Sequence, residues 1–144
     1  MKKLLNLSLF LILILLFFSG CDNKSSIDIV NANLEKQTDR TLIKISIAVN
    51  TGWSDYWELY PEIDAKLLDN LGNEFSVLDT MDANFSGKIK ESGVYHGILV
   101  FPVLPEEATL LRLKINNIRH YEHGNDGYYL EGLYVITYKF DLKK

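Results

Sequence analysis

The sequence has very little cysteine, since Cys21 is the single one among 144 residues. A single cysteine excludes an intrachain disulfide and a zinc site built from several thiolates. The folded part of the chain must therefore be stabilised mainly by burial of apolar side chains. Tyrosine is frequent, with eight residues, and β-branched residues are common. Both kinds of residue favour β-strands.

Recognisable catalytic motifs are also absent. The sequence contains no G-x-S-x-G elbow, no H-E-x-x-H pair, no phosphate-binding glycine loop and no dinucleotide fingerprint. The adjacent residues Glu106 and Glu107 would point in different directions in a strand or a helix, so they are poorly placed for acid–base catalysis. We therefore expect a protein that is not an enzyme and has no cofactor.

Clusters of basic residues are scarce as well. The densest run contains Arg112, Lys114 and Arg119. A nucleic-acid surface needs clustered Lys and Arg side chains that replace phosphate counterions. The sequence therefore argues against nucleic acid as a partner.

The first 21 residues carry the clearest signal in the chain. Two lysines precede an apolar run over residues 4–18, and small residues follow this run before Cys21. This is the order of the charged, apolar and cleavage regions of a secretory signal peptide. The run is short for a membrane span, which needs about 20 apolar residues. We predict that residues 1–20 are a cleaved signal peptide.

The end of this segment resembles the lipobox of bacterial lipoproteins. Ser19, Gly20 and Cys21 match its small-small-cysteine pattern, whereas Phe18 stands where leucine is usual. The resemblance implies that Cys21 receives a diacylglyceryl thioether, that the chain is cut after Gly20, and that the new amino terminus is often acylated. Two or three acyl chains anchor a protein stably, whereas one does so only marginally. An ordinary secreted protein or a single-span anchor is the alternative.

Residues 21–26 would then be the lipidated cysteine and a polar tether, followed by one domain over residues 27–144. At about 3.3 Å per residue, this tether would hold the domain within roughly 20 Å of the membrane. Asp22 resembles the inner-membrane retention signal of Gram-negative lipoproteins, which implies the periplasmic face of that membrane. In a Gram-positive cell this position would carry no such signal.

The charge of the mature chain suggests how the domain would meet the membrane. Removing residues 1–20 takes two lysines from 15 basic residues, so 13 basic and 19 acidic residues remain, for a net charge of −6. Anionic head groups repel such a domain weakly. We expect it to stand off the bilayer.

The alternation of apolar and polar residues predicts an all-β fold. The clearest runs are 42–49, 111–115 and 134–142. Residues 27–34 change face midway, which predicts an edge strand with a bulge. About seven short strands without an amphipathic helix or a helical crossover predict an antiparallel β-sandwich. An eight-stranded barrel, in which one sheet closes on itself, is the alternative.

The connections between these runs are of two kinds. Asn70–Asn73 predicts a hairpin turn in which Gly72 takes a positive φ. Gly97, inside a strand pattern, indicates a close backbone approach or a bulge. No sustained alternation is present over residues 50–62 or 119–132, so we predict an aromatic loop and a polar excursion there.

The middle of the chain resembles a known family. Asp69–Phe75 has the form D-x-x-G-N-x-aromatic, and Gly93–Val103 has the form G-x-x-x-G-x-L-V-F-x-V. This combination is similar to the immunoglobulin-like domains of uncharacterised bacterial lipoproteins and of the immunoprotective extracellular antigen family. The resemblance covers roughly half of the mature domain and implies an exported immunoglobulin-like sandwich. It brings no catalytic residues with it.

The predicted aromatic loop contains Trp53, Tyr56, Trp57 and Tyr60. Such rings could stack on a sugar or a protein partner, because they combine a large apolar area with a polar atom. The alternative is that Trp53 or Trp57 plugs the open end of the sandwich, where burial of an indole stabilises the fold by a few kcal/mol.

The predicted excursion contains His120, His123 and Asp126, which could act as metal ligands together with nearby glutamates. On a strand, His120 and His123 would face opposite sides, so only a turn or a helix would bring them together. The alternative is a pair of neutral imidazoles on a solvated loop.

The sequence as a whole predicts a lipid-anchored extracytoplasmic protein that contacts the membrane through Cys21. Sandwich scaffolds commonly place recognition in their end loops. We therefore expect it to bind a protein partner or to support an assembly at the cell envelope. The alternative is a small-ligand module, for a glycan or a metal, that uses loop 53–60 or loop 120–131.

Overall fold

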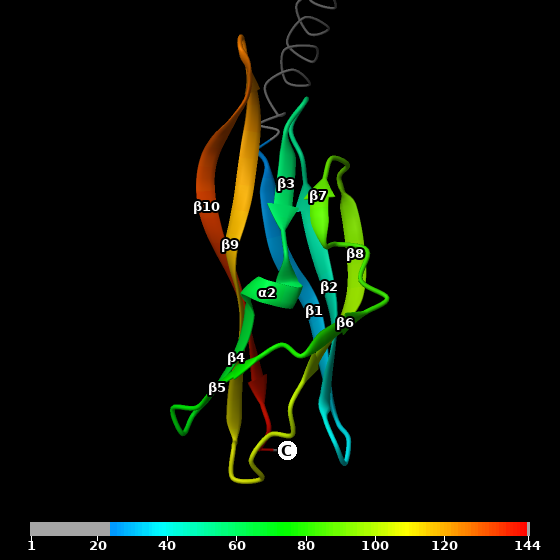
Figure 1. Ribbon diagram of the computed structural model, residues 1–144, viewed down its shortest axis with the longest axis vertical. Coiled ribbons are helices and arrows are strands. Elements are labelled where there is room, and N and C mark those ends of the chain that lie inside the picture. The colour runs from blue at the N-terminus through cyan, green and yellow to red at the C-terminus, as the bar shows by residue number, and fades with distance from the viewer. Residues whose placement is uncertain (1–23, 144) are drawn as a thin grey trace, which may run out of the picture.

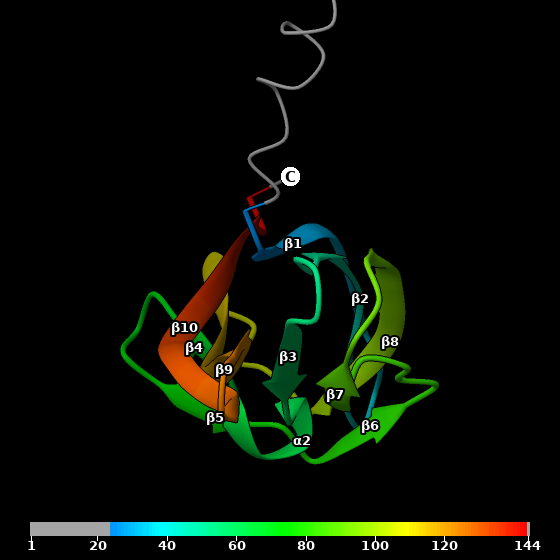
Figure 2. The same ribbon diagram turned by 90° about the horizontal axis from the view of Figure 1, so that it is seen from above.

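The computed structural model describes residues 24–143, which form two antiparallel sheets packed together (Figures 1 and 2). The predicted signal peptide and Cys21 lie outside the described residues. The elements are β1 (Ser26–Lys36), β2 (Thr41–Asn50), β3 (Tyr56–Leu59), α2 (Pro61–Asp64), β4 (Ala65–Asp69), β5 (Glu74–Ser76), β6 (Asp79–Met81), β7 (Gly87–Ile89), β8 (Gly93–Phe101), β9 (Leu110–Gly124) and β10 (Gly127–Asp141).

The first sheet has the order β1-β2-β8-β6, and the second has the order β5-β4-β9-β3-β7 with β10 paired to β9. Strand β9 organises the second sheet: β10 pairs with it along one side, while β4 and then β3 share its other side. The two separate sheets confirm the predicted β-sandwich. More than seven strands are present because β5, β6 and β7 have three residues each, which is too short to show a periodicity.

The core lies between the inner faces of the two sheets. On β2, every second residue from Ile43 to Val49 is buried, and the same holds on β9 from Leu111 to Ile115. These are two of the three runs that alternate most clearly in the sequence. Strand β10 adds Ile136 and Phe140, the buried part of the third run.

Two local predictions for the β-strands and turns are confirmed. Strand β1 lies at the edge of its sheet and has a register shift between Ile29 and Asn31. Gly72 has φ +92°, in a turn whose amides at Leu71 and Asn73 donate to the Asp69 carboxylate over 2.9 and 2.8 Å. The side chain of Asp69 therefore holds the turn that Gly72 makes possible.

Gly97 confirms the predicted close approach in β8. A Cβ atom at this position would lie 2.8 Å from the Cα atom of Ala83 and would also overlap the ring of Phe85. The fully buried Phe85 thus packs directly on the backbone of β8. Only glycine at position 97 leaves room for Ala83 and Phe85 to lie this close to β8.

The predicted loop over residues 50–62 is wrong in part, because it contains β3 and α2. Trp57 and Leu59 are buried, so this strand alternates over only four residues. Ile63, directly after this range, lies in α2 and is 71% exposed. A four-residue strand followed directly by a helical turn leaves no periodic signal in the sequence.

The predicted excursion over residues 119–132 is also wrong, because β9 and β10 continue through it as a hairpin. The reason is a bulge in β9, where Asn116 and Asn117 together oppose Val135 and Asn117 has φ 53°. The inward positions change there from odd to even numbers, so Ile118 and His120 are buried. A β-bulge interrupts the period of two on which the prediction depended.

Helix α2 lies beside this bulge, between the ends of β3 and β4 (Figure 1). The side-chain amides of Asn116 and Asn117 donate to the backbone oxygen of Asp64 over 3.3 Å and to its carboxylate over 2.6 Å. The bulge therefore marks the point where β9 changes its partner from β4 to β3. No helix within residues 24–143 has the length and apolar character that crossing a membrane requires.

Candidate functional site

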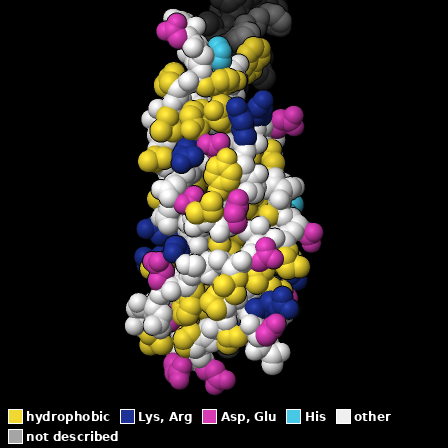
Figure 3. Space-filling model, in the orientation of Figure 1, with side chains coloured by type: hydrophobic (Ala, Val, Ile, Leu, Met, Phe, Trp, Pro, Cys, Tyr) yellow, Lys and Arg dark blue, Asp and Glu magenta, His cyan; other side chains and the backbone are white. Residues whose placement is uncertain are grey.

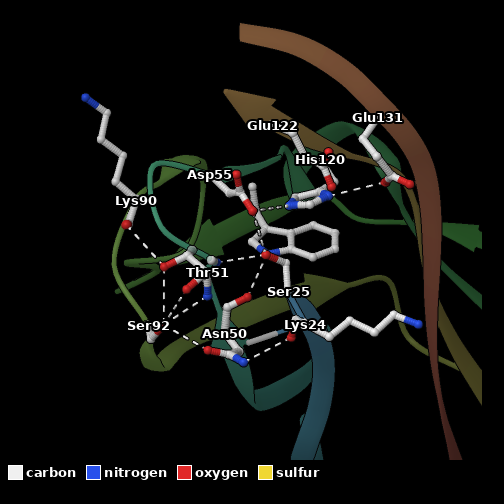
Figure 4. Close-up of polar contacts among 12 residues, drawn as sticks. Lys24, Ser25, Asn50, Thr51, Asp55, Lys90, Ser92, His120, Glu122 and Glu131 are labelled. Carbon is white, nitrogen blue, oxygen red and sulfur yellow. Dashed lines mark hydrogen bonds and ion pairs between the residues drawn. The ribbon is translucent and has the colours of Figure 1, made fainter. Parts of the chain in front are cut away.

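The candidate site lies at the end of the sandwich where the described chain begins, called here the N-terminal end. The turns β2–β3 and β9–β10 are at this end (Figure 1). The Ser25 hydroxyl donates to Asp55 Oδ2 over 3.0 Å and accepts the amide of Gly52 over 2.8 Å. The Asn50 side chain donates to the Lys24 carbonyl over 3.1 Å (Figure 4). The start of the domain is thus bound to the β2–β3 loop.

His120 is the buried polar group at the centre of this end. Its ring is 4% exposed and stacks on Trp57, with 4.3 Å between ring centroids. Its Nδ1 lies 3.3 Å from Glu131 Oε2, and its Nε2 lies 3.7 Å from Asp55 Oδ2 and has no hydrogen-bond partner within residues 24–143. The imidazole is therefore placed between two carboxylates (Figure 4).

Glu131 joins this cluster to β10. The Tyr134 hydroxyl donates to Glu131 Oε2, and this bond, with that to His120, holds the pKa of the Glu131 carboxyl below its ordinary value. The same contact raises the pKa of the Tyr134 phenol. A recess of about 160 Å³ opens here, lined by Lys24, Ser25, Asp55, His120, Glu122, Glu131 and Tyr134.

The chemistry of this cluster is limited by its contacts. A serine or threonine nucleophile needs its hydroxyl in contact with a general base. Ser25 donates to Asp55 rather than to His120, and among residues 24–143 no serine or threonine hydroxyl is hydrogen-bonded to the His120 ring. The hydrogen bonds of the cluster join the β2–β3 loop to Ser25 and β9 to β10.

A tyrosine cluster covers the outer face of the second sheet near the same end. Tyr56 and Tyr121 stack with 4.6 Å between centroids and 14° between ring planes. Tyr128 meets Tyr56 edge-on at 5.0 Å, and Lys88 Nζ lies 3.5 Å from the Tyr56 centroid. Partial desolvation is the main cause that raises the pKa of the Tyr56 phenol. These rings bind one another and a cation from the same chain.

A run of exposed apolar side chains lies on the part of the β9–β10 hairpin beyond the bulge, residues 118–135, called here the distal hairpin. Its β10 side chains are exposed on both faces of the strand, and hydrophobic side chains are visible over this region in Figure 3. The exposed fractions are Tyr128 50%, Tyr129 52%, Leu130 47%, Leu133 63%, Tyr134 38% and Val135 52%. Within residues 24–143, β10 pairs only with β9, so its other edge is unpaired.

The four aromatic residues of the predicted binding loop take different positions. Trp57 is 1% exposed and donates its indole N–H to the Asn50 carbonyl over 3.1 Å, as the plug alternative predicts. Trp53 is 93% exposed. Tyr56 belongs to the tyrosine cluster, and Tyr60 donates to Glu58 over 3.1 Å. The structure therefore does not bring the four rings together on one face.

The three residues of the predicted metal site are also separated. His120 faces the core, whereas His123 is exposed and meets Tyr128 edge-on at 5.1 Å. Asp126 lies in the turn between β9 and β10. Within residues 24–143, no three His, Cys, Asp or Glu side chains are grouped so that they could hold a metal.

Sequence reasoning did not find a contact on the outer face of the first sheet. Ser46 Oγ and His96 Nδ1 are 2.9 Å apart, in a recess of about 360 Å³ that Asp82 also lines. The residues are 50 apart in the chain and become neighbours through β2–β8 pairing. Within residues 24–143, no carboxylate is hydrogen-bonded to the His96 ring.

Sequence reasoning also missed the exposed strand. Residues 128–136 contain seven large apolar residues in nine positions, more than a strand with one buried face requires. This excess is a signal that the sequence carries. Comparison of the chain with family models, curated proteins and solved structures found no match.

Proposed function

We propose that this protein is a lipid-anchored, extracytoplasmic lipoprotein of the cell envelope that has no catalytic activity and binds a protein partner through the distal hairpin. The anchor would be the lipidated Cys21, after removal of residues 1–20. The resemblance to a lipobox and to immunoglobulin-like lipoprotein domains supports the export and anchoring parts of this proposal. The relation to that domain family stays a prediction.

The observation that carries the partner-binding part is the exposure of β10. Natural edge strands are usually short, charged or covered, because unpaired backbone groups recruit other strands. Strand β10 has 15 residues, and Leu130, Leu133 and Val135 expose apolar side chains beside its unpaired edge. A protein segment that adds as a strand would cover both the backbone edge and these side chains. The occupant we propose is therefore an extended segment of another envelope protein.

The alternative of a small-ligand module has less support. Of its predicted aromatic residues, Trp53 is exposed, but Trp57 is buried in the core and Tyr56 already stacks on Tyr121. Binding of the mature protein to a glycan array, or a thermal shift on addition of a metal ion, would favour this alternative.

Labelling with palmitate tests the anchor. The wild-type protein should incorporate the label and fractionate with membranes, and Cys21→Ala should do neither. A Cys21→Ala protein that is still cleaved and still membrane-bound would contradict the lipoprotein proposal.

A photo-crosslinking residue tests the partner surface. Placed at Leu133, which is 63% exposed, it should capture one stoichiometric envelope protein in intact cells. The matched control is Leu78, which is 65% exposed and lies between β5 and β6. Equal capture at both positions, or capture at neither, would contradict binding through the distal hairpin.

A further inference from the structure

The N-terminal end of the sandwich exposes aromatic rings that come from two separate turns. Trp53, in the β2–β3 loop, is 93% exposed, and Tyr128 and Tyr129, beside the β9–β10 turn, are 50% and 52% exposed. Tryptophan and tyrosine combine an apolar ring with a polar atom and are enriched where membranes meet water. The rings therefore suit the head-group region of a bilayer.

The described chain also begins at this end. The hydrogen bonds from Asn50 to Lys24, and between Ser25, Gly52 and Asp55, hold the first described residues against the loop that carries Trp53 (Figure 4). Ser25 is therefore part of the folded domain, although the sequence placed it in the tether. Any anchor that precedes Lys24 reaches the domain beside Trp53.

The length of chain before Lys24 sets how far this end can stand from an anchor at Cys21. Three Cα–Cα steps separate Lys24 from Cys21, and they span at most about 11 Å when fully extended. The head-group layer on each side of a bilayer is itself about 5–7 Å thick. A lipidated Cys21 therefore keeps the N-terminal end within a few ångströms of the head groups.

We propose that the N-terminal end lies on the phospholipid surface, with Trp53, Tyr128 and Tyr129 in the head-group region. This inference rests on the proposed lipid anchor at Cys21. It replaces the expectation from net charge that the domain stands off the bilayer, because the tether is shorter than the sequence indicated. The distal hairpin then meets its partner close to the membrane.

Charge contributes little to this contact. Lys24 and Lys90 are exposed at the same end and can approach lipid phosphates, but Glu91 and Asp126 are exposed there too. These opposite charges offset one another. The occupant is therefore a bilayer surface that the rings recognise, and the contact depends weakly on the content of anionic lipid.

Tryptophan fluorescence of the lipidated full-length protein in phosphatidylethanolamine–phosphatidylglycerol vesicles tests the proposal. The fluorescence of Trp53 is obtained by subtracting the signal of Trp53→Phe from that of the wild type. In Trp53→Phe, the buried Trp57 is the remaining tryptophan. Iodide quenching of Trp53 should fall at least about twofold on reconstitution, and brominated phospholipid should quench it. The matched control adds Val103→Trp to Trp53→Phe; Val103 is 52% exposed in the β8–β9 connection at the opposite end. This probe should stay open to iodide and insensitive to brominated lipid.

Vesicle flotation separates the two proposals. If the protein floats with the vesicles but iodide quenches Trp53 as strongly as it quenches the tryptophan at position 103, the membrane contact is overturned and the anchor is left intact. Failure of the wild-type protein to float overturns both. A third outcome is that protection of Trp53 from iodide increases with protein density at constant lipid, while brominated lipid does not quench it. This outcome identifies a second copy of the chain as the occupant and overturns the membrane contact.

Discussion

The two halves of the β9–β10 hairpin have the same strands and the same pairing but opposite surfaces. Before the bulge, Leu111, Leu113 and Ile115 face the core and are fully buried, opposite Phe140 and Ile136. Beyond the bulge, β9 still buries Ile118 and His120, whereas β10 exposes large apolar side chains on both faces. One hairpin is therefore core scaffold along one half and exposed apolar surface, the partner surface that we propose, along the other.

This difference shows what makes a strand part of a scaffold. In the first half, the facing sheet covers the inner side of both strands. In the distal hairpin, Trp57 and His120 fill the inner side of β9, whereas the apolar side chains of β10 stay exposed. Both halves of β10 carry large apolar residues, but only Ile136 and Phe140, in the half that packs on the core, are buried.

The largest expected effect on stability concerns Trp57, which fills the inner side of the distal hairpin. Trp57→Ala removes a fully buried indole that stacks on His120, and it should lower the free energy of unfolding by about 3–5 kcal/mol. Urea unfolding followed by circular dichroism measures the change. A loss of unfolding free energy as small as that of a substitution at an exposed position would show that packing on the inner side of the distal hairpin does not stabilise the fold.

A pair of leucines tests the comparison directly. Leu113→Ala, in the buried half, should cost about 2–5 kcal/mol of unfolding free energy. Leu133→Ala, in the exposed half, should change it by no more than about 0.5 kcal/mol. The two proteins are compared by urea unfolding in parallel. Equal costs would mean that Leu133 is covered in solution, by another part of the chain or by a second copy.

A smaller effect should appear on acidification. The hydrogen bonds from Tyr134 and His120 lower the pKa of Glu131 in the folded state. The folded value lies below the unfolded value, so this stabilisation is present above the unfolded pKa, at neutral pH, and is lost as the pH falls through the folded pKa. Unfolding of wild type and Glu131→Gln between about pH 3 and pH 7 should show a weaker acid dependence in the variant.

The control for this pH experiment is Glu106→Gln, at an exposed position after β8. No hydrogen bond of the Glu106 side chain is found within residues 24–143. The control should keep the acid dependence of the wild type. An unchanged dependence in Glu131→Gln would show that the contact with Tyr134 contributes nothing to stability.

Much of the fold was predictable from local patterns. Strand β2, the first half of β9 and the second half of β10 have one buried face each, so their apolar residues alternate in the sequence. The turn at Gly72 and the close approach at Gly97 were predictable because each depends on the one residue without a side chain. These features are determined by the residues that form them.

The candidate site was less predictable, because it depends on partners distant in the chain. His120 is 65 residues from Asp55 and 11 from Glu131, and it faces inward only because of the bulge at Asn117. From the sequence, His120 and His123 could act together as metal ligands only in a turn or a helix, and both lie on strand β9, on opposite faces. Trp53 and Trp57 are similar in sequence context, yet one is exposed and the other is buried.

The sequence by itself determined the all-β class and the main core strands, because an alternating pattern has one low-energy arrangement with its apolar face buried. It also carried the signal from which export and lipidation are predicted. Only the tertiary structure decided which apolar residues remain outside the core. The cause is that burial depends on how the two sheets pack, and this packing leaves the side chains of β10 beyond the bulge exposed.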